Sequence, residues 1–403
     1  MNLKDDAKQI IEYAINQVKP NEAVRKALEG KTFSCGKKIL VAIGKAAYEM
    51  AKSTVEIIDI DEGIVISKYG HIKSSIKNCE MYEAGHPISD KNTFKATKRA
   101  LEITENLSQE DTVIFLVSGG GSALFEDSYL SLEELQDINN QLLKSGASIN
   151  EINTIRKRLS KVKGGKFALH CKPAHIFSIV LSDIINDPLD MIASGPAYSD
   201  SSTCQDALNI IDKYSLNLSD EAMKYINIET PKNIEDVETI ISGSIKQLCL
   251  AAYDKAKQLG YKPIIIKDNE QGIAKDVGKE LALLANKQEP GTCLIMGGET
   301  VVKITGNGKG GRNQELALSA ARFIDDNVAL FSLGSDGTDG PTDAAGGYVD
   351  KGVINKIKEL NINIDSVLDN NDSYNTLKQV DGLIITGPTG TNVNDLMVAL
   401  IIQ

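Results

Sequence analysis

The run Thr112–Val117, with the sequence TVIFLV, leads directly into the glycine-rich loop SGGGS at residues 118–122. Consecutive apolar and β-branched residues predict a strand buried on both faces, as in a parallel sheet. Glycines allow a sharp turn and bring backbone N–H groups close to a bound anion. Because ligands of open parallel sheets sit at the carboxyl ends of strands, the loop is either an anion-binding loop or a tight strand-to-helix connection. Its residues are Ser118, Gly119, Gly120, Gly121 and Ser122.

Strands and helices alternate through about residue 240, which predicts parallel βαβ units. Beyond that point, Thr292–Met296 and Val301–Thr305 form two apolar runs around a short glycine turn, which predicts a hairpin and a mixed sheet. A chain of 403 residues is long for a single hydrophobic core. We therefore predict an α/β fold with two domains, residues 1–236 and residues 237–403, divided near a polar segment.

The net charge is −11, from 44 basic and 55 acidic residues. This balance argues against nucleic acid as a partner, because binding a phosphate backbone needs a basic face. The chain has no apolar run long enough for a transmembrane helix, and its N-terminal segment is charged rather than signal-like. Widely spaced cysteines without CxxC pairs fit a reducing compartment and do not indicate zinc. We expect a cytoplasmic protein that does not bind membranes.

Polar residues follow other predicted strands, where α/β folds build their sites. Lys45 follows Gly44 at the end of the apolar run 38–43, where a lysine can reach a phosphate or a developing negative charge. Asp183 and Asp187 follow another buried strand. They suit Mg²⁺ coordination or removal of a hydroxyl proton, and a turn or capping role is the alternative.

Arg312 follows two glycines and opens a predicted helix, where it could hold a carboxylate or phosphate through two parallel hydrogen bonds. The aspartates at 336, 339 and 343 resemble a calcium loop only superficially, because the glutamate at position twelve is missing. His86 precedes a proline and is interpreted as a turn residue. Neither a P-loop nor a GxGxxG fingerprint is present.

Together these motifs resemble the type-2 glycerate kinase family, the glycerate 2-kinases with a C-terminal MOFRL domain. The motifs occur in order from one end of the chain to the other. They are VAIGKA (41–46), GHP (85–87), VSGGGSAL (117–124), NTIRK (153–157), KGG (163–165), LSDIINDP (181–188), ASGP (193–196), GGET (297–300), GGRNQE (310–315), GSDGTDGPTD (334–343) and GPTGTN (387–392).

The resemblance implies ATP-dependent phosphorylation of D-glycerate on its 2-hydroxyl, giving 2-phosphoglycerate, with Mg²⁺ as cofactor. It also implies a Rossmann-like N-terminal domain, a smaller C-terminal α/β domain and an active site in the cleft between them. In this interpretation the catalytic residues are Lys45, Asp183 and Arg312, and the metal ligands are Asp183 and Asp187. The nucleotide contacts are residues 118–122, Lys163 and Gly164, and the substrate contacts are Lys45, Arg156, Arg312 and Asp339.

Two other functions stay open at this point. Members of the family have carried the name hydroxypyruvate reductase, which would require NAD(P)H, and the missing dinucleotide fingerprint speaks against it. The other is a non-catalytic protein that binds a sugar phosphate or hydroxy acid. The sequence also leaves open whether the chain forms a homodimer.

Overall fold

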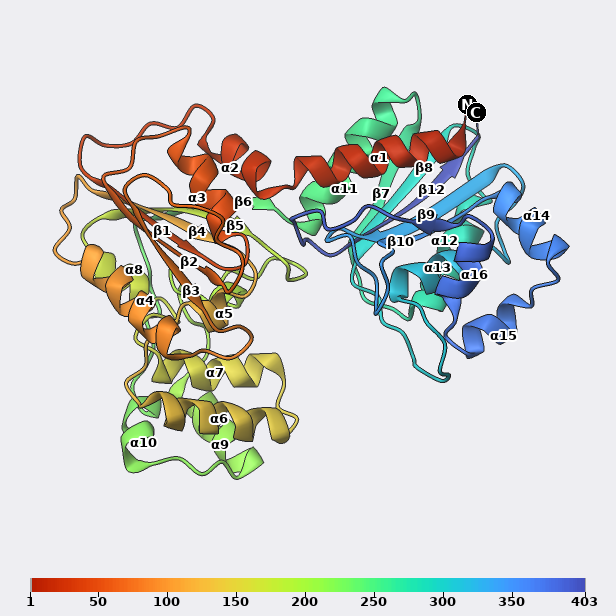
Figure 1. Ribbon diagram of the computed structural model, residues 1–403. Coiled ribbons are helices and arrows are strands. Elements are labelled where there is room, and N and C mark those ends of the chain that lie inside the picture. Colours follow the sequence, from red (N-terminus) through yellow and green to blue (C-terminus); the bar gives the residue numbers. More distant parts are fainter. Residues whose placement is uncertain (1, 403) are drawn as a thin grey trace. The chain divides into compact units, whose positions relative to one another are not determined.

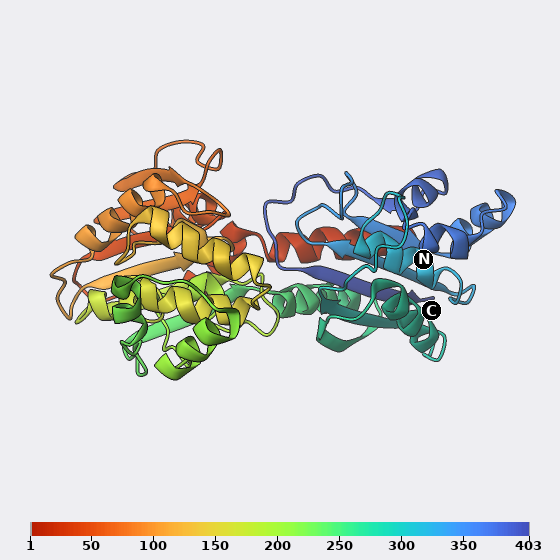
Figure 2. The same cartoon turned by 90° about the horizontal axis from the view of Figure 1, so that it is seen from below.

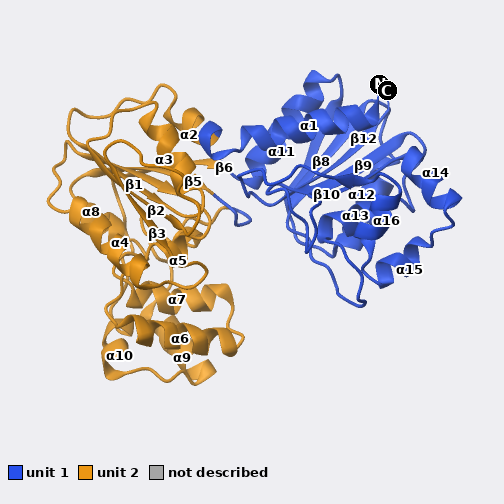
Figure 3. Cartoon of the chain, viewed as in Figure 1, with its two compact units in different colours: residues 1–22, 182–186, 243–403 blue, residues 23–181, 187–242 orange. Residues whose placement is uncertain are grey.

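The computed structural model describes residues 2–402, which form two compact units. Unit 1 comprises residues 1–22, 182–186 and 243–403, and unit 2 comprises residues 23–181 and 187–242 (Figure 3). Met1 and Gln403, the outer ends of the predicted domains, lie outside the described residues.

These units differ from a single division between residues 236 and 237. The N-terminal helix α1 (Leu3–Gln17) packs against α11 (Ile245–Gln258) and so belongs with the C-terminal half. In contrast, β6 (Val237–Gly243) extends the N-terminal sheet. The apolar face of α1, which includes Ile10 and Ala14, packs in the hydrophobic core of the C-terminal sheet. This packing explains why α1 belongs to unit 1.

Unit 2 is built on one six-stranded sheet with the order β3-β2-β1-β4-β5-β6. Its other strands are β1 (Lys38–Ile43), β2 (Glu62–Lys68), β3 (Cys79–Ala84), β4 (Thr112–Val117) and β5 (His175–Leu181). The pairs from β3 to β5 are parallel. This is the strand order of the doubly wound Rossmann fold, so the predicted Rossmann-like sheet is confirmed.

The central strand β4 is buried along its whole length, as predicted. Ile114 and Leu116 face a core with α2 (Pro20–Leu28) and α3 (Ala47–Val55). Phe115 faces the other way and packs its ring on Phe125 and Phe167. The sheet therefore has an apolar core on each side, which is why residues 113–117 are all apolar.

The remaining helices of unit 2 cover the second face and form a separate helical layer beyond the sheet (Figures 1 and 2). They are α4 (Lys91–Ile103), α5 (Gly121–Leu124), α6 (Leu132–Lys144), α7 (Ile149–Leu159), α8 (Lys166–Cys171), the 3₁₀ turn η1 (Ile192–Ser194), α9 (Cys204–Tyr214) and α10 (Asp220–Ile226). The layer of α6, α7, α9 and α10 has its own apolar core, which includes Leu142, Ile155 and Ile226.

Unit 1 contains a mixed six-stranded sheet with the order β11-β10-β9-β12-β8-β7, which confirms the predicted mixed sheet. Its strands are β7 (Lys262–Glu270), β8 (Thr292–Gly298), β9 (Val328–Gly334), β10 (Gly346–Val349), β11 (Leu383–Ile384) and β12 (Asp395–Ile401). Only β7 and β8 pair in parallel, while β12 runs antiparallel to both β8 and β9.

Helices α1 and α11 lie on one face of this sheet, and α12 (Ala274–Ala285) and α13 (Arg312–Ala320) lie on the other (Figure 1). Three short helices complete the unit: α14 (Lys351–Glu359), α15 (Ile364–Asp369) and α16 (Ser373–Gln379). Between residues 2 and 402, every helix is too short or too polar to cross a membrane.

The predicted hairpin of Thr292–Met296 with Val301–Thr305 is wrong. Strand β8 has β7 on one side and β12 on the other, so neither of its edges is open to a returning strand. Val301 instead makes an isolated parallel bridge with Ile273. The sheet is mixed because β12, from the end of the chain, inserts between β8 and β9.

Candidate functional site

The carboxyl ends of β1 and β4 mark the point where the strand order of unit 2 reverses direction. Successive strands lead outward from β1 through β2 to β3 and, on the other side, from β4 through β5 to β6. Open α/β sheets bind their ligands at such a switch point. Ile43 pairs with Val117, so Lys45 and the glycine loop leave the sheet side by side. The backbone N–H of Lys45 donates to the carbonyl oxygen of Gly119, at 2.9 Å.

Two glycines make this close approach sterically feasible. Gly44 has a φ of +110°, and a Cβ there would lie 2.4 Å from the carbonyl oxygen of Ser118. Gly120 has a φ of +86°, and a Cβ there would lie 2.9 Å from the imidazole of His86. Larger residues would force the two loops apart, so the glycines serve to bring the backbones and His86 together.

The glycine loop presents backbone donors that the protein does not use. The N–H of Ser118 donates to Ile43, and that of Gly121 closes a turn onto Ser118. The N–H groups of Gly119, Gly120 and Ser122 donate to no acceptor within residues 2–402. Neighbouring unpaired N–H groups on a turn form a concavity suited to an anion.

Lys45 and His86 lie beside Gly120 of this loop, and two further basic side chains, Lys68 and His71, are close to them. Lys45 is exposed, and His86 is partly buried. Burial lowers the pKa of His86, and the charges of Lys45, Lys68 and His71 lower it further. These groups are therefore close enough to act on one another. An anion placed among them would relieve their mutual repulsion.

Arg156, predicted as a substrate contact, also reaches the glycine loop. Its Nη2 donates to the carbonyl oxygen of Ser122 at 2.9 Å. Burial lowers the pKa of this guanidinium, and Glu126 partly opposes that effect. Arg156 makes no ion pair with a carboxylate between residues 2 and 402, so its charge is available to an acidic ligand. The backbone N–H of Gly164, a predicted nucleotide contact, donates to the carbonyl oxygen of Ser194 at 3.0 Å.

Lys163 does not fit its predicted role in nucleotide binding. Its side chain is fully buried, and its Nζ lies 2.7 Å from Glu126 Oε2 and 2.8 Å from the carbonyl oxygen of Phe125. Burial lowers the pKa of the ammonium group to about 8. An ammonium enclosed by protein oxygens cannot reach a nucleotide, so Lys163 is a structural residue of the interior.

Unit 1 contains a second polar site, a cavity of about 270 Å³ at the ends of the central strands of its sheet. The ends of β8 and β9 and the start of β12 meet here, because Asp395 pairs in register with Gly298 and with Gly334. The cavity is lined by Asp183, Glu299, Arg312, Gly334, Ser335, Asp336, Asn392, Asn394 and Asp395. Four of these residues are acidic, so a cation or a metal–phosphate complex suits the cavity better than a free anion.

Arg312 is the first residue of α13, and Asp395, which lines the same cavity, fixes its side chain. Its Nε donates to Asp395 Oδ2 at 2.5 Å and its Nη2 to Asp395 Oδ1 at 3.0 Å. Its Nη1 lies 3.4 Å from Glu299. Burial raises the pKa of Asp395 to about 6, although the pair with Arg312 favours the charged form. The guanidinium keeps about a third of its surface exposed, so it is fixed in position yet open to a ligand.

Asp339 does not fit its predicted role as a substrate contact. Its carboxylate is almost fully buried and accepts the backbone N–H groups of Asn313 and Gln314, at 3.1 and 2.9 Å. It also accepts a hydrogen bond from the side chain of Gln314 at 2.9 Å. Asp339 therefore fixes the first turn of α13 and, with it, the position of Arg312.

The two aspartates predicted to bind a metal belong to different compact units, with Asp183 in unit 1 and Asp187 in unit 2. Their shared Mg²⁺ site stays a prediction. Within residues 2–402, no group of three or more His, Cys, Asp or Glu side chains is arranged to hold a metal. Mg²⁺ in nucleotide-dependent enzymes needs only one or two protein carboxylates, because phosphates and water complete its shell. The acidic cavity fits such a partial ligand set.

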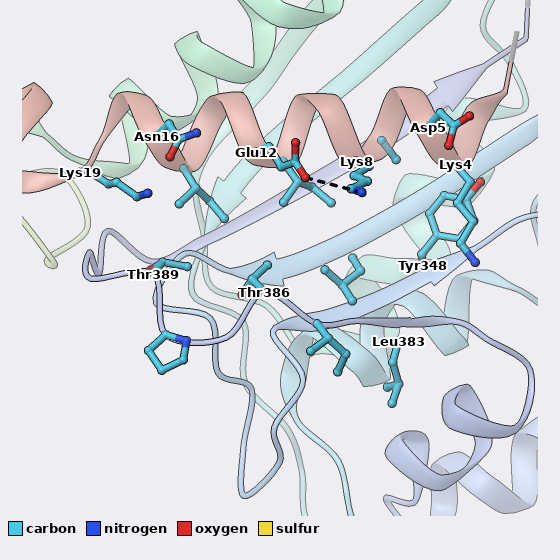
Figure 4. Close-up of a pocket in the computed structure, with 16 residues that line it drawn as sticks. Lys4, Asp5, Lys8, Glu12, Asn16, Lys19, Tyr348, Leu383, Thr386 and Thr389 are labelled. Atoms are coloured by element: carbon cyan, nitrogen blue, oxygen red, sulfur yellow. Dashed lines mark ion pairs between the residues drawn. The ribbon is translucent and has the colours of Figure 1, made fainter.

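Another cavity, of about 540 Å³, lies between α1 and the edge of the unit 1 sheet and contains none of the predicted site residues. Figure 4 shows Lys8 and Glu12 of α1 joined by an ion pair on one side, with Leu383 and Thr386 on the other. Its lysines and carboxylates alternate along the helix, so it has no dominant charge.

Sequence reasoning missed several residues of both sites. His86 was interpreted as a turn residue, although three nearby cations act on its pKa. Asp395, Glu299 and Asn394 were not assigned to any site. The glutamate was visible in the GGET motif directly after a strand, which was the available signal. Asp395 could not be found, since its partner Arg312 is distant in sequence.

Comparison with known proteins covers the whole chain. A family model described as a domain of unknown function, DUF4147, matches residues 6–227, and the MOFRL family model matches residues 292–395. The D-glycerate 2-kinase of Thermotoga maritima is 48% identical, over 100% of this chain and 99% of its own. The glycerate 2-kinase of Pyrococcus horikoshii is 40% identical, over 100% and 98%. The crystal structure of the Thermotoga maritima glycerate kinase covers 99% of both chains with a TM-score of 0.93 and 47% identity.

Proposed function

This chain belongs to the glycerate 2-kinase family with a C-terminal MOFRL domain, and we propose that it transfers the γ-phosphoryl group of ATP to the 2-hydroxyl of D-glycerate. The products are 2-phosphoglycerate and ADP. The observation that carries this proposal is the switch point of unit 2, where the unused N–H groups of one glycine loop lie near four basic side chains.

The glycine loop supplies the contacts that phosphates require. The N–H groups of Gly119, Gly120 and Ser122 have no protein acceptor and suit the oxygens of a nucleotide phosphate. Lys45 leaves the neighbouring strand next to them, and its exposed ammonium group can follow the charge of the transferring phosphoryl group. Phosphoryl transfer depends on such positioning and charge neutralisation more than on covalent chemistry by the protein.

The acidic cavity of unit 1 supplies a different part of the reaction. Asp183 and Asp336 offer carboxylate oxygens, the ligands that Mg²⁺ prefers, and Arg312 adds a fixed positive charge. When bound, Mg²⁺ neutralises phosphate charge and orients the leaving group. Arg312 can bind a phosphate or the glycerate carboxylate through its exposed edge, since Asp395 holds its other edge.

In the transfer step, the oxygen of the 2-hydroxyl bonds to the γ-phosphorus while the bond from that phosphorus to the bridging oxygen breaks. The electron pair of the broken bond leaves with ADP, and the hydroxyl proton passes to a carboxylate. Asp183 and Asp187 are both candidates for that base. Arg156, which donates to the backbone carbonyl of Ser122, provides a contact for the carboxylate of the acceptor.

Release of ADP, measured in a coupled assay with D-glycerate, tests this function. Hydroxypyruvate-dependent NADH oxidation is measured in parallel. We expect ADP release, and Lys45→Ala and Arg312→Ala each to lower kcat by about two to three orders of magnitude. Suitable controls are Lys37→Ala, before the opposite end of β1, and Arg322→Ala, beyond the opposite end of α13. Near-normal turnover in both site variants, or oxidation of NADH without ADP release, would refute the proposal.

A further inference from the structure

Three polar side chains, Ser122, Ser194 and Asn153, form a relay of hydrogen bonds that begins at the glycine loop of unit 2. Ser122 Oγ lies 3.0 Å from Ser194 Oγ, which donates to Asn153 Oδ1, also at 3.0 Å. Asn153 and Ser194 are almost fully buried, whereas Ser122 is partly exposed. This relay therefore connects the interior of unit 2 to the surface at the switch point. Ser122 is also a predicted nucleotide contact, whereas no role was predicted for Ser194 and Asn153.

The direction of the protons in this chain follows from its inner end. The amide nitrogen of Asn153 faces the sulfur of Met191 at 3.9 Å, and a thioether accepts hydrogen bonds but cannot donate them. The carbonyl oxygen of Asn153 therefore faces Ser194, which must donate to it. Because Ser194 has a single hydroxyl proton, Ser122 must donate its own proton to Ser194. The outer oxygen, Ser122 Oγ, keeps its lone pairs and has no proton left to offer.

The backbone that carries Ser194 is held in an unusual conformation. Ala193, Ser194 and Gly195 have φ angles of +51°, +62° and +64°. Non-glycine residues keep such angles only where the surrounding structure enforces them, and they cluster at functional sites. Here the N–H groups of Gly164 and Gly165 bind the carbonyl oxygens of Ser194 and Gly195, at 3.0 and 2.7 Å. The position of the Ser194 hydroxyl is thus set by hydrogen bonds on both sides.

Arg156 places a positive charge at the outer end of the same chain. Its Nη2 donates to the backbone carbonyl of Ser122, and it forms no close ion pair with a carboxylate within residues 2–402, although Glu126 is near enough to act on its charge. A guanidinium beside a hydroxyl that can only accept matches a ligand with a carboxylate and a nearby O–H group. That ligand class is a small hydroxy acid.

We propose that the relay from Asn153 through Ser194 to Ser122 recognises the hydroxyl of the acceptor that does not react, which in glycerate is the 3-hydroxyl. This assignment rests on the proposed function. A chain that ends on an amide cannot take up a proton, because a carboxamide is not a base at neutral pH. The relay is therefore suited to binding an O–H group and not to activating one. It makes the enzyme specific for acids that carry a second hydroxyl.

The test compares D-glycerate with D-lactate, which has the same configuration but lacks the 3-hydroxyl. In the unmodified protein, turnover of glycerate tests the proposed function by itself. We expect Ser122→Ala and Ser194→Ala to raise the KM for glycerate roughly 2- to 12-fold, the range for one neutral hydrogen bond, with kcat within about twofold. The Ki of D-lactate as a competitive inhibitor should stay unchanged, because lactate has no group for the relay to bind.

Two further variants separate recognition from folding. Asn153→Asp keeps an oxygen that only accepts, so it should lose less affinity for glycerate than Asn153→Leu, which removes the acceptor. Ser178→Ala deletes another fully buried hydroxyl of unit 2, bonded to Tyr198 at 2.9 Å, and should leave the glycerate-to-lactate ratio unchanged. Ser122→Ala remains informative if the Ser194 variant fails to fold, because Ser122 is partly exposed.

Two outcomes would overturn the relay while leaving the kinase function intact. One is an equal loss of affinity for glycerate and lactate in Ser122→Ala and Ser194→Ala. The other is a loss confined to kcat, which would place the relay in the chemical step. Absence of glycerate turnover in the unmodified protein would instead refute the proposed function.

Discussion

The polar sites of the two units carry opposite charge. At the switch point of unit 2, the side chains of Lys45, Lys68 and His71 lower the pKa of His86, so basic groups dominate the surroundings of this histidine. In the cavity of unit 1, four acidic side chains accompany one arginine, and burial raises the pKa of Asp395 to about 6. In each site a titrating group shifts towards its neutral form. The first site therefore favours an anion and the second a cation, which matches phosphates on one side and a metal ion on the other.

The two sites also hold their principal cation differently. Lys45 is exposed at the end of a strand, and its ammonium group is free to follow a moving charge. Arg312 is fixed by two hydrogen bonds to Asp395 and by the capped first turn of α13. A lysine acts as a point charge, while an arginine gives geometric recognition, so the difference suits a transferring group and an anchored one.

The largest expected effect concerns the buried Lys163. It tests whether ligands of unit 2 are bound by exposed basic side chains and not by this buried one. Lys163→Ala would leave the fully buried carboxylate of Glu126 without its partner. We expect the free energy of unfolding to fall by about 3–5 kcal/mol, because an unpaired buried charge is strongly destabilising. Urea unfolding measures this change, and the KM for ATP of the folded fraction should not change.

Lys161→Ala provides the matched control, since the partly exposed Lys161 pairs with the largely buried Asp127 and its loss should destabilise the protein less than the loss of Lys163. The double variant Lys163→Met with Glu126→Leu should recover much of the loss, because it removes both charges. If Lys163→Ala instead kept its stability and weakened ATP binding, the phosphate site would extend into the interior and the contrast between the units would fail.

The next effect concerns the pH dependence of unit 1. Protonation of Asp395 removes the acceptor that holds Arg312, so kcat/KM should fall as the pH drops through about 6, approaching tenfold per pH unit. Stability should change in the opposite direction. Because the native pKa lies above that of the unfolded chain, the contribution of Asp395 to the free energy of unfolding is complete below about pH 4 and is lost as the pH rises through 6.

Asp395→Asn separates this group from the other acids around it, Glu299 and Asp339. The difference in melting temperature between the unmodified protein and this variant, followed from pH 4 to 7, isolates the contribution of Asp395. The step in kcat/KM near pH 6 should disappear in the variant, at a lower overall rate. Persistence of the step would assign it to another group and leave the acid-rich cavity without a titrating role.

The parts of the fold that the sequence predicted well are those set by local patterns. The run at β4 indicated burial on both faces, and Ile114 and Phe115 indeed face different cores. Pairing between strands that are distant in sequence depends instead on which strands compete for the same neighbour. The predicted hairpin at residues 292–305 was wrong because β12, from the end of the chain, occupies the edge of β8 that a hairpin would need. A local pattern does not contain that competition.

The same limit applies to the candidate site. The sequence correctly indicated that Lys45 and the glycine loop lie together, because each directly follows its own strand and parallel neighbours bring both to the same end of the sheet. Lys163 and Asp339 lie in equally glycine-rich motifs, yet one pairs with Glu126 and the other caps α13. Whether a charged residue binds a ligand or the protein itself depends on partners distant in sequence, which spacing alone does not show.

The smallest expected effect is a change in the pKa of His86, which reports on the charges around the switch point of unit 2. Lys45→Ala removes the strongest of the charges that lower the pKa of His86, so this pKa should rise. Lys68→Ala should raise it less, and inorganic phosphate or ATP added to the unmodified protein should raise it as well, since an anion stabilises the imidazolium. The pKa can be followed by NMR on the four histidines, with His170, bonded to the carbonyl of Leu101, as the internal control. A His86 pKa unaffected by both Lys45→Ala and phosphate would mean that the basic side chains do not share one anion site, and unit 2 would lose the property that distinguishes it from unit 1.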